Sequence, residues 1–167
     1  MFVGFGFRAV VADPKSNTIR GCPTCRFADI PRMDSLYYDL DTLVIRSADE
    51  KAALLEDFRQ RSYANMADRV IAAFNRLKID FEHEQLILIR HDEGSGTVAA
   101  HPLDVRRTGS RLDVRIRRSI PEVRLAVLDC HCFGIIAPRE IDQLVLKPDL
   151  QPATTIALGE QVLSAPP

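Results

Sequence analysis

Residues 124–139 read RLAVLDCHCFGIIAPR, an apolar run with a Cys-His-Cys triplet near its middle. The run predicts a strand, in which successive side chains alternate between the two faces. Cys130 and Cys132 then point to one face, and His131 points to the other. The rest of the chain is most simply arranged around this strand.

The two remaining cysteines lie in Cys22-Pro23-Thr24-Cys25. A Cys-Pro-x-Cys turn is typical of a zinc knuckle, which aims two thiolates at one point. Two same-face strand cysteines have Cα atoms about 6.7 Å apart, near the upper limit for a disulfide, whereas a metal tolerates that spacing more readily. The simplest interpretation is that the two pairs meet and clamp distant segments together. We therefore predict a structural zinc site with four sulfur ligands: Cys22, Cys25, Cys130 and Cys132.

Two alternatives stay open for these residues: one or two disulfides, including bridges between the pairs, or plain buried thiols. The expected compartment depends on the state of the cysteines, since bound zinc indicates the cytoplasm and disulfides indicate export. Residues 1–12 lack the positive start and the cleavage site of a signal peptide, so we expect none.

The Cys-Pro-Thr-Cys stretch also resembles the active-site dithiol of glutaredoxin-like oxidoreductases. That chemistry requires the first cysteine at a helix N-terminus, where the dipole lowers its pKa. Pro31 falls within the second turn of any helix that would follow, so a thiol-disulfide oxidoreductase using Cys22 and Cys25 is an alternative and not the leading expectation.

The composition, 46% hydrophobic and 27% charged over 167 residues, is that of an ordinary globular chain. A net charge of −1 provides no global field that would attract nucleic acid or an anionic membrane. No apolar run approaches the roughly 20 residues of a transmembrane helix. We expect one domain over residues 1–148 and an extended C-terminal tail over residues 149–167.

Hydrophobic periodicity indicates an α+β fold. Ser47 opens a capping box with Glu50 and predicts a helix over residues 48–59, and three- and four-residue spacing predicts a second over residues 63–77. We expect a mostly antiparallel sheet or half-open barrel with both helices packed on one face. Besides the central run, strands are predicted over residues 2–12, 42–46, 85–90, 98–107, 112–118 and 141–147.

Arginines crowd one predicted hairpin, and three of them are our partner-binding candidates: Arg111, Arg115 and Arg117. Alternate strand positions share a face, so such a row could follow a phosphate backbone. No aromatic residues interleave for base stacking, and Asp104 and Asp113 dilute the charge. A solvated sheet face that resists edge pairing is the favoured interpretation. Residues 91–96, HDEGSG, are expected to form a polar connection.

A resemblance covers residues 42–147. Ile79-Asp80-Phe81, the apolar residues 86–89 and the loop Gly94-Ser95-Gly96 before a hairpin are similar to the small bacterial C-terminal domain of protease-complex stabilising proteins. The resemblance implies an accessory or binding module without catalytic residues. The cysteine pairs and the arginine-rich hairpin depart from the pattern of that family.

The leading functional expectation is a non-enzymatic accessory or interaction subunit that is stapled by zinc or a disulfide and docks on a protein partner. The alternatives are the oxidoreductase above and a zinc-stapled nucleic-acid-binding protein. We expect no nucleic-acid partner and no membrane span.

Overall fold

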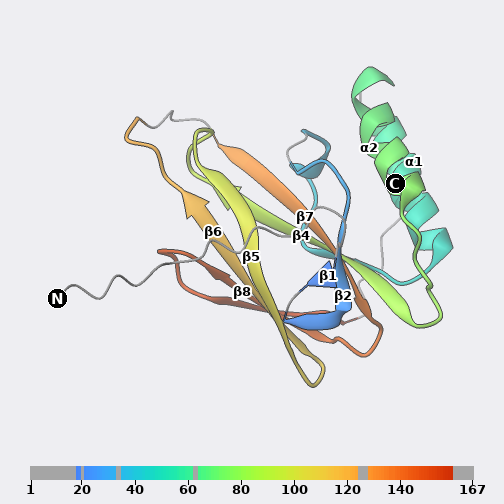
Figure 1. The fold of residues 1–167 in the computed structure, drawn as a ribbon. Coiled ribbons are helices and arrows are strands. Elements are labelled where there is room, and N and C mark those ends of the chain that lie inside the picture. The colour runs from blue at the N-terminus through green and yellow to red at the C-terminus, as the bar shows by residue number, and fades with distance from the viewer. Residues whose placement is uncertain (1–17, 20, 33–34, 62–63, 124–127, 160–167) are drawn as a thin grey trace.

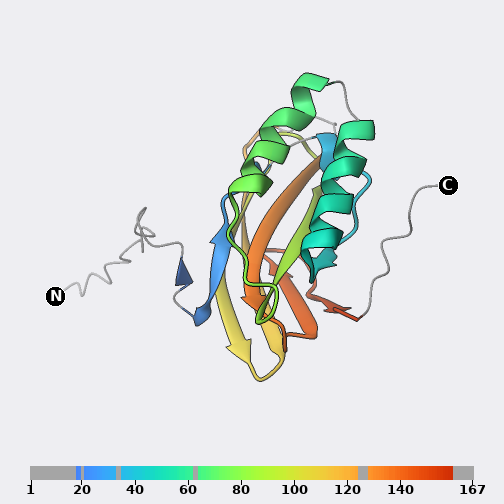
Figure 2. The same ribbon diagram turned by 90° about the vertical axis from the view of Figure 1, so that its right-hand side faces the viewer.

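The protein, as a computed structural model, is described over residues 18–19, 21–32, 35–61, 64–123 and 128–159. These residues form three layers: two helices, a five-stranded sheet and a four-stranded sheet (Figures 1 and 2). The mostly antiparallel character and the helices are as predicted, but there are two sheets rather than one, and they do not close into a barrel. The strand predicted over residues 2–12 lies outside the described residues.

The five-stranded sheet is antiparallel throughout and has the order β1-β2-β7-β4-β3. Its centre is β7, the predicted core strand, which pairs with β4 along its whole length. Both faces of β7 are covered, which explains its nearly continuous apolar sequence. The bounds are β1 Thr18–Ile19, β2 Cys22–Ala28, β3 Leu43–Ile45, β4 Glu84–Glu93 and β7 Asp129–Pro138.

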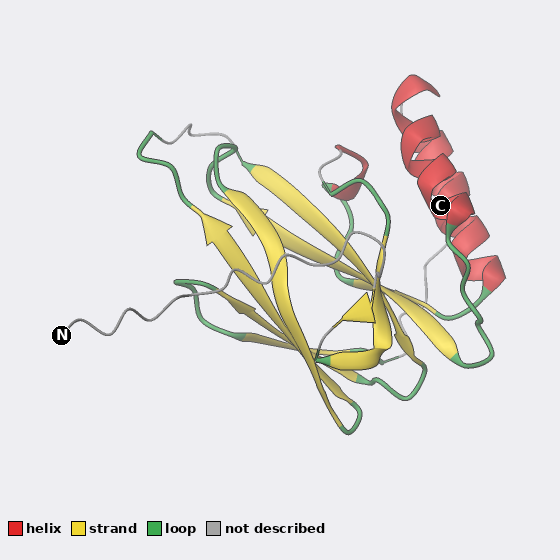
Figure 3. Cartoon of the chain, in the orientation of Figure 1, coloured by secondary structure: helices red, strands yellow, loops and turns green. Residues whose placement is uncertain are grey.

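The four-stranded sheet has the order β5-β6-β8-β9. Its strands are β5 Ala99–Thr108, β6 Arg111–Ser119, β8 Gln143–Pro148 and β9 Thr154–Ala157. The β6 and β8 strands are parallel, while the other pairs are antiparallel (Figure 3). Strand β9 lies within the segment expected to be an extended tail, and Leu158 after it is buried.

The helices α1 Ala48–Arg61 and α2 Ala64–Arg76 cover the outer face of the five-stranded sheet. The predicted cap is present, because the Ser47 hydroxyl accepts a hydrogen bond from the Glu50 amide at 3.0 Å. The Glu50 carboxylate reaches back to the amide of Arg46. Phe58 of α1 contacts Phe74 of α2 edge to face, so the two helices pack as one layer on the sheet.

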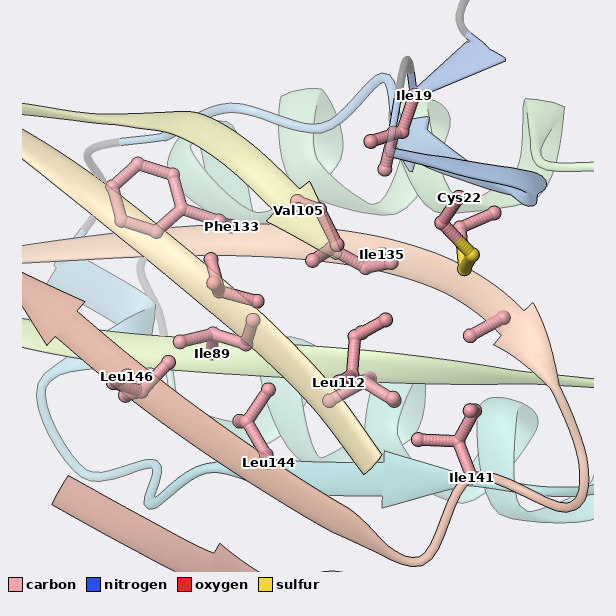
Figure 4. Packing of buried hydrophobic residues seen from close by; sticks show 14 of the residues in the cluster. Ile19, Cys22, Ile89, Val105, Leu112, Phe133, Ile135, Ile141, Leu144 and Leu146 are labelled. Atoms are coloured by element: carbon pink, nitrogen blue, oxygen red, sulfur yellow. A yellow bond between two sulfur atoms is a disulfide. The ribbon is translucent and has the colours of Figure 1, made fainter. Parts of the chain in front are cut away.

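A second apolar core fills the space between the two sheets (Figure 4). Side chains along a strand alternate between its two faces. Ile87 and Ile89 of β4 therefore face the four-stranded sheet, whereas Leu86 and Leu88 face the helices. The predicted inward row of β6 is confirmed, since its three members are fully buried: Leu112, Val114 and Ile116.

The two sheets are joined differently along their two sides. On one side, Gly21 lies so close to the carbonyl of Val105 that a Cβ there would be 2.1 Å from its oxygen. On the other side, the Arg46 guanidinium donates to the backbone carbonyls of Leu158 and Gly159. One side is therefore closed by a close backbone contact, and on the other side hydrogen bonds from Arg46 link the sheets.

Candidate functional site

The four cysteines do not converge. Cys22 and Cys25 lie in the core between the sheets, whereas Cys130 and Cys132 lie in the core beneath the helices. Arg26, which follows Cys25, pairs with Ile136. Ile136 is about 13 Å along β7 from Cys132 at about 3.3 Å per residue. The predicted four-sulfur clamp is therefore corrected: the pairs are separated both by a sheet and along a strand.

The two pairs also differ in chemical state. Cys22 and Cys25 are bonded as a disulfide, and Cys130 and Cys132 are free and buried. Burial raises the pKa of the Cys130 thiol to about 11, and burial raises that of Cys132 further. Both thiols are therefore protonated near neutral pH, which makes them poor nucleophiles.

A buried polar cluster occupies one end of the space between the sheets. His91 and His131 are direct cross-strand partners on β4 and β7, and so are Glu93 and Asp129. Each of these four side chains is buried. The sequence suggested a polar surface connection at residues 91–93, but they are the last part of β4. Extending the alternation Ile87, Ile89 by two more steps would have placed His91 and Glu93 inward.

Glu93 is the centre of this cluster. Its carboxylate accepts hydrogen bonds from Arg118 Nε and Nη2, both at 2.6 Å, and is 2.8 Å from His91 Nε2. Burial opposes ionisation of Glu93, but the hydrogen bonds from Arg118 and His91 outweigh it, so the pKa of Glu93 lies below its ordinary value. The Glu93 hydrogen bond correspondingly raises the pKa of Arg118. Glu93 and Arg118 thus form a charged link between the two sheets.

His131 supports a neighbouring connection, because its Nε2 is 3.1 Å from the carbonyl oxygen of Val98, the residue before β5. Its ring stacks on that of Phe133. The Asp129 carboxylate accepts a hydrogen bond from the amide of Cys130. These groups are paired with protein atoms, so the cluster holds strand ends in place.

Three connections lie at the end of the sandwich beside this cluster, at the left of Figure 1: residues 94–98, the described residues 120–123 and 128 between β6 and β7, and residues 149–153. We call this the loop end. The Thr97 hydroxyl donates to the carbonyl of Val123, and Arg118 donates to the carbonyl of Asp149. Large apolar side chains project here, with 75% of Val123, 76% of Leu128 and 87% of Leu150 exposed. Leu150 also has a φ of 63°, a left-handed conformation rare for leucine.

The three arginines predicted to bind a partner lie on the outer face of β6. Arg111 forms an ion pair with Asp113 at 2.8 Å, and Arg115 with Asp149 at 3.1 Å. Arg117 is exposed and has no ion pair with any of the described residues. Most of this row is thus neutralised by carboxylates on the same surface.

A groove of about 610 Å³ borders the disulfide turn, with walls that include Pro23, Thr24, His83 and Arg139. The Arg26–Glu84 ion pair lies in it. Beside it, Asp80, Glu82 and His83 place metal-capable atoms within 4.8 Å of one another, and all three residues are exposed. Such exposed acidic groups commonly occur without an ion.

Comparison of the chain with protein-family models, curated proteins and solved structures found no match. The resemblance of residues 42–147 to the protease-complex domain therefore stays a prediction. Neither α1 nor α2, the helices of the described residues, is long and apolar enough to cross a membrane.

Proposed function

We propose that this protein is a non-enzymatic accessory module that binds a partner protein through its loop end. One observation carries the proposal: Val123, Leu128 and Leu150 are largely exposed and lie on connections at the same end of the sandwich. Clustered exposed apolar side chains mark interaction sites on soluble proteins.

The base of this surface is cross-linked by hydrogen bonds of Arg118. Glu93 and Arg118 bind the ends of β4 and β6 together, and Arg118 also holds the backbone at Asp149. Loops on a fixed framework lose less conformational entropy when they bind, which favours their use in recognition.

The alternatives receive less support. Cys22 and Cys25 are each 1% exposed, and Cys22 begins a strand rather than a helix, so an incoming thiolate has little access and no helix dipole lowers a pKa. For nucleic-acid binding, Arg111 and Arg115 are already paired with carboxylates.

The test is a variant with aspartate at all three apolar positions, Val123→Asp, Leu128→Asp and Leu150→Asp. Proteins cross-linked to the chain in its own cells are identified, and each is then titrated as a purified protein by calorimetry. We expect the triple variant to lose at least about tenfold in affinity for the true partner, because charges would be buried in an apolar contact.

The matched control is Leu103→Asp, since Leu103 is also an exposed apolar residue but lies within β5. It should bind as the unmodified chain does. Equal binding by the triple variant, or an equal loss in the control, would contradict the proposal. Thermal unfolding of each variant checks that the fold is retained.

A further inference from the structure

Strand β9 is an edge of the four-stranded sheet, and its outer side carries unpaired backbone groups. Leu158 donates its amide hydrogen to the carbonyl of Asp142, one position beyond the last register pair of β8 and β9, Gln143 with Ala157. Hydrogen bonding alternates along an antiparallel pair, so Thr154 and Ile156 also bond toward β8. The amides and carbonyls of Thr155 and Ala157 consequently point outward, where no described residue pairs with them.

The same alternation is visible on β8, because the amide of Gln143, which lies opposite Ala157, bonds to Ser110 on the far side. The open edge has a defined end. Arg46 donates a hydrogen bond to the carbonyl of Gly159, so the unpaired part of the edge ends after Ala157.

Natural edge strands are usually protected against pairing by charged side chains, prolines or bulges. Strand β5, the opposite edge, has such protection: it contains Pro102 and a bulge between Pro102 and Asp104. Strand β9 has none. Residues 151–159, QPATTIALG, contain no ionisable side chain, and the four strand residues, TTIA, contain no proline.

We propose that β9 pairs with β9 of a second copy of this chain, antiparallel about a two-fold axis at Ile156. This proposal is independent of the loop-end function. Outward positions must face outward positions, and the proposed register places Thr155 opposite Ala157 of the second copy and Ile156 opposite Ile156. This arrangement forms four backbone hydrogen bonds and joins the two four-stranded sheets into one.

Side-chain chemistry is compatible with self-pairing. An uncharged edge places no like charges opposite each other when two copies meet. Ile156 is half-buried and packs against the core between the sheets. Its counterpart across the axis would cover the remaining exposed surface, which extends the apolar core through the interface.

A cysteine at the axis tests the register. At Ile156→Cys, the opposed Cα atoms of a non-hydrogen-bonded pair would be about 4.5 Å apart, within disulfide range. We expect Ile156→Cys to yield a covalent dimer on mild oxidation. The matched control Thr155→Cys places its cysteine opposite Ala157, so it should remain uncross-linked.

Proline at an outward position tests the edge itself. Thr155→Pro removes an outward amide hydrogen and leaves the bonds to β8 intact. Sedimentation should show a weak dimer of the unmodified chain, with a dissociation constant on the order of 0.1 mM, and a monomer for Thr155→Pro with an unchanged Tm. An unmodified chain that stays monomeric to about 1 mM would overturn the proposal, as would dimerisation that Thr155→Pro leaves unchanged.

Discussion

Arg118 of β6 and Glu93 of β4 face each other across the two sheets, joined by two hydrogen bonds of 2.6 Å. Both side chains are largely withdrawn from water, with 12% of the Arg118 side chain and 1% of the Glu93 side chain exposed. The sequence suggested that sulfur atoms would clamp distant segments together. In the structure, a buried charge pair does this between the sheets.

We expect Glu93→Gln to destabilise the protein by about 3 kcal/mol, because it leaves the Arg118 charge buried without a counter-charge. Chemical denaturation measures this loss. The double variant Glu93→Gln with Arg118→Met should lose less than the sum of the two single variants, which identifies a direct interaction. Additive losses would show that the two side chains act separately.

The pH dependence of stability should reflect the same pair. The pKa of folded Glu93 lies below its ordinary value of 4.5, so its contribution is complete above that value and is lost as the pH falls through the folded pKa. Thermal denaturation between pH 7 and pH 3 should therefore show a steeper acid loss for the unmodified chain than for Glu93→Gln. Parallel curves would contradict the assignment.

Gly21→Ala should destabilise the protein by about 1–3 kcal/mol, because the new Cβ would overlap the carbonyl oxygen of Val105 and push the sheets apart. The control is Gly94→Ala, where a Cβ meets nothing within 4 Å, and which should change stability by less than about 0.5 kcal/mol. Urea denaturation of both variants makes the comparison. A loss in both would point to backbone freedom and not to the contact.

Thiol counting distinguishes the disulfide from the zinc hypothesis. Without reductant, the folded protein should react slowly with a thiol reagent, because Cys130 and Cys132 are buried and their pKa values are raised. Unfolding without reductant should expose two thiols, and unfolding with reductant should expose all four cysteines in the chain. Stoichiometric zinc in elemental analysis, with all four thiols free, would refute the disulfide.

Arg115→Ala should change stability by no more than about 1 kcal/mol, because its ion pair with Asp149 lies on an exposed surface. The effect should shrink further at 1 M salt, where charges are screened within about 3 Å. Thermal denaturation at low and high salt measures both. A large, salt-independent loss would mean that Arg115 has a packing role.

Local signals in the sequence predicted local structure well. The Ser47 cap located the start of α1, and the alternation of Leu112, Val114 and Ile116 gave the inward face of β6. Alternation also placed Cys130 and Cys132 on one face of β7. What it could not reveal is which layer each face contacts, because β7 is covered by apolar groups on both sides.

The candidate site was harder to predict because it depends on contacts between distant strands. Polar residues such as His91 and Glu93 normally indicate surface, and the buried charge of Glu93 is balanced by Arg118, which lies in the other sheet. Strand β9 was missed for a related reason. Its four residues have no internal signal, and their pairing partner is β8.

The path of the chain through the layers has a consequence for folding. It passes from β4 in one sheet to β5 and β6 in the other, returns for β7, and leaves again for β8. Neither sheet can be completed before the other has begun. Strand β6 pairs with β8, and the whole of β7 separates these two strands in the sequence. We therefore expect slow, cooperative folding in a single transition, with no half of the molecule able to fold alone.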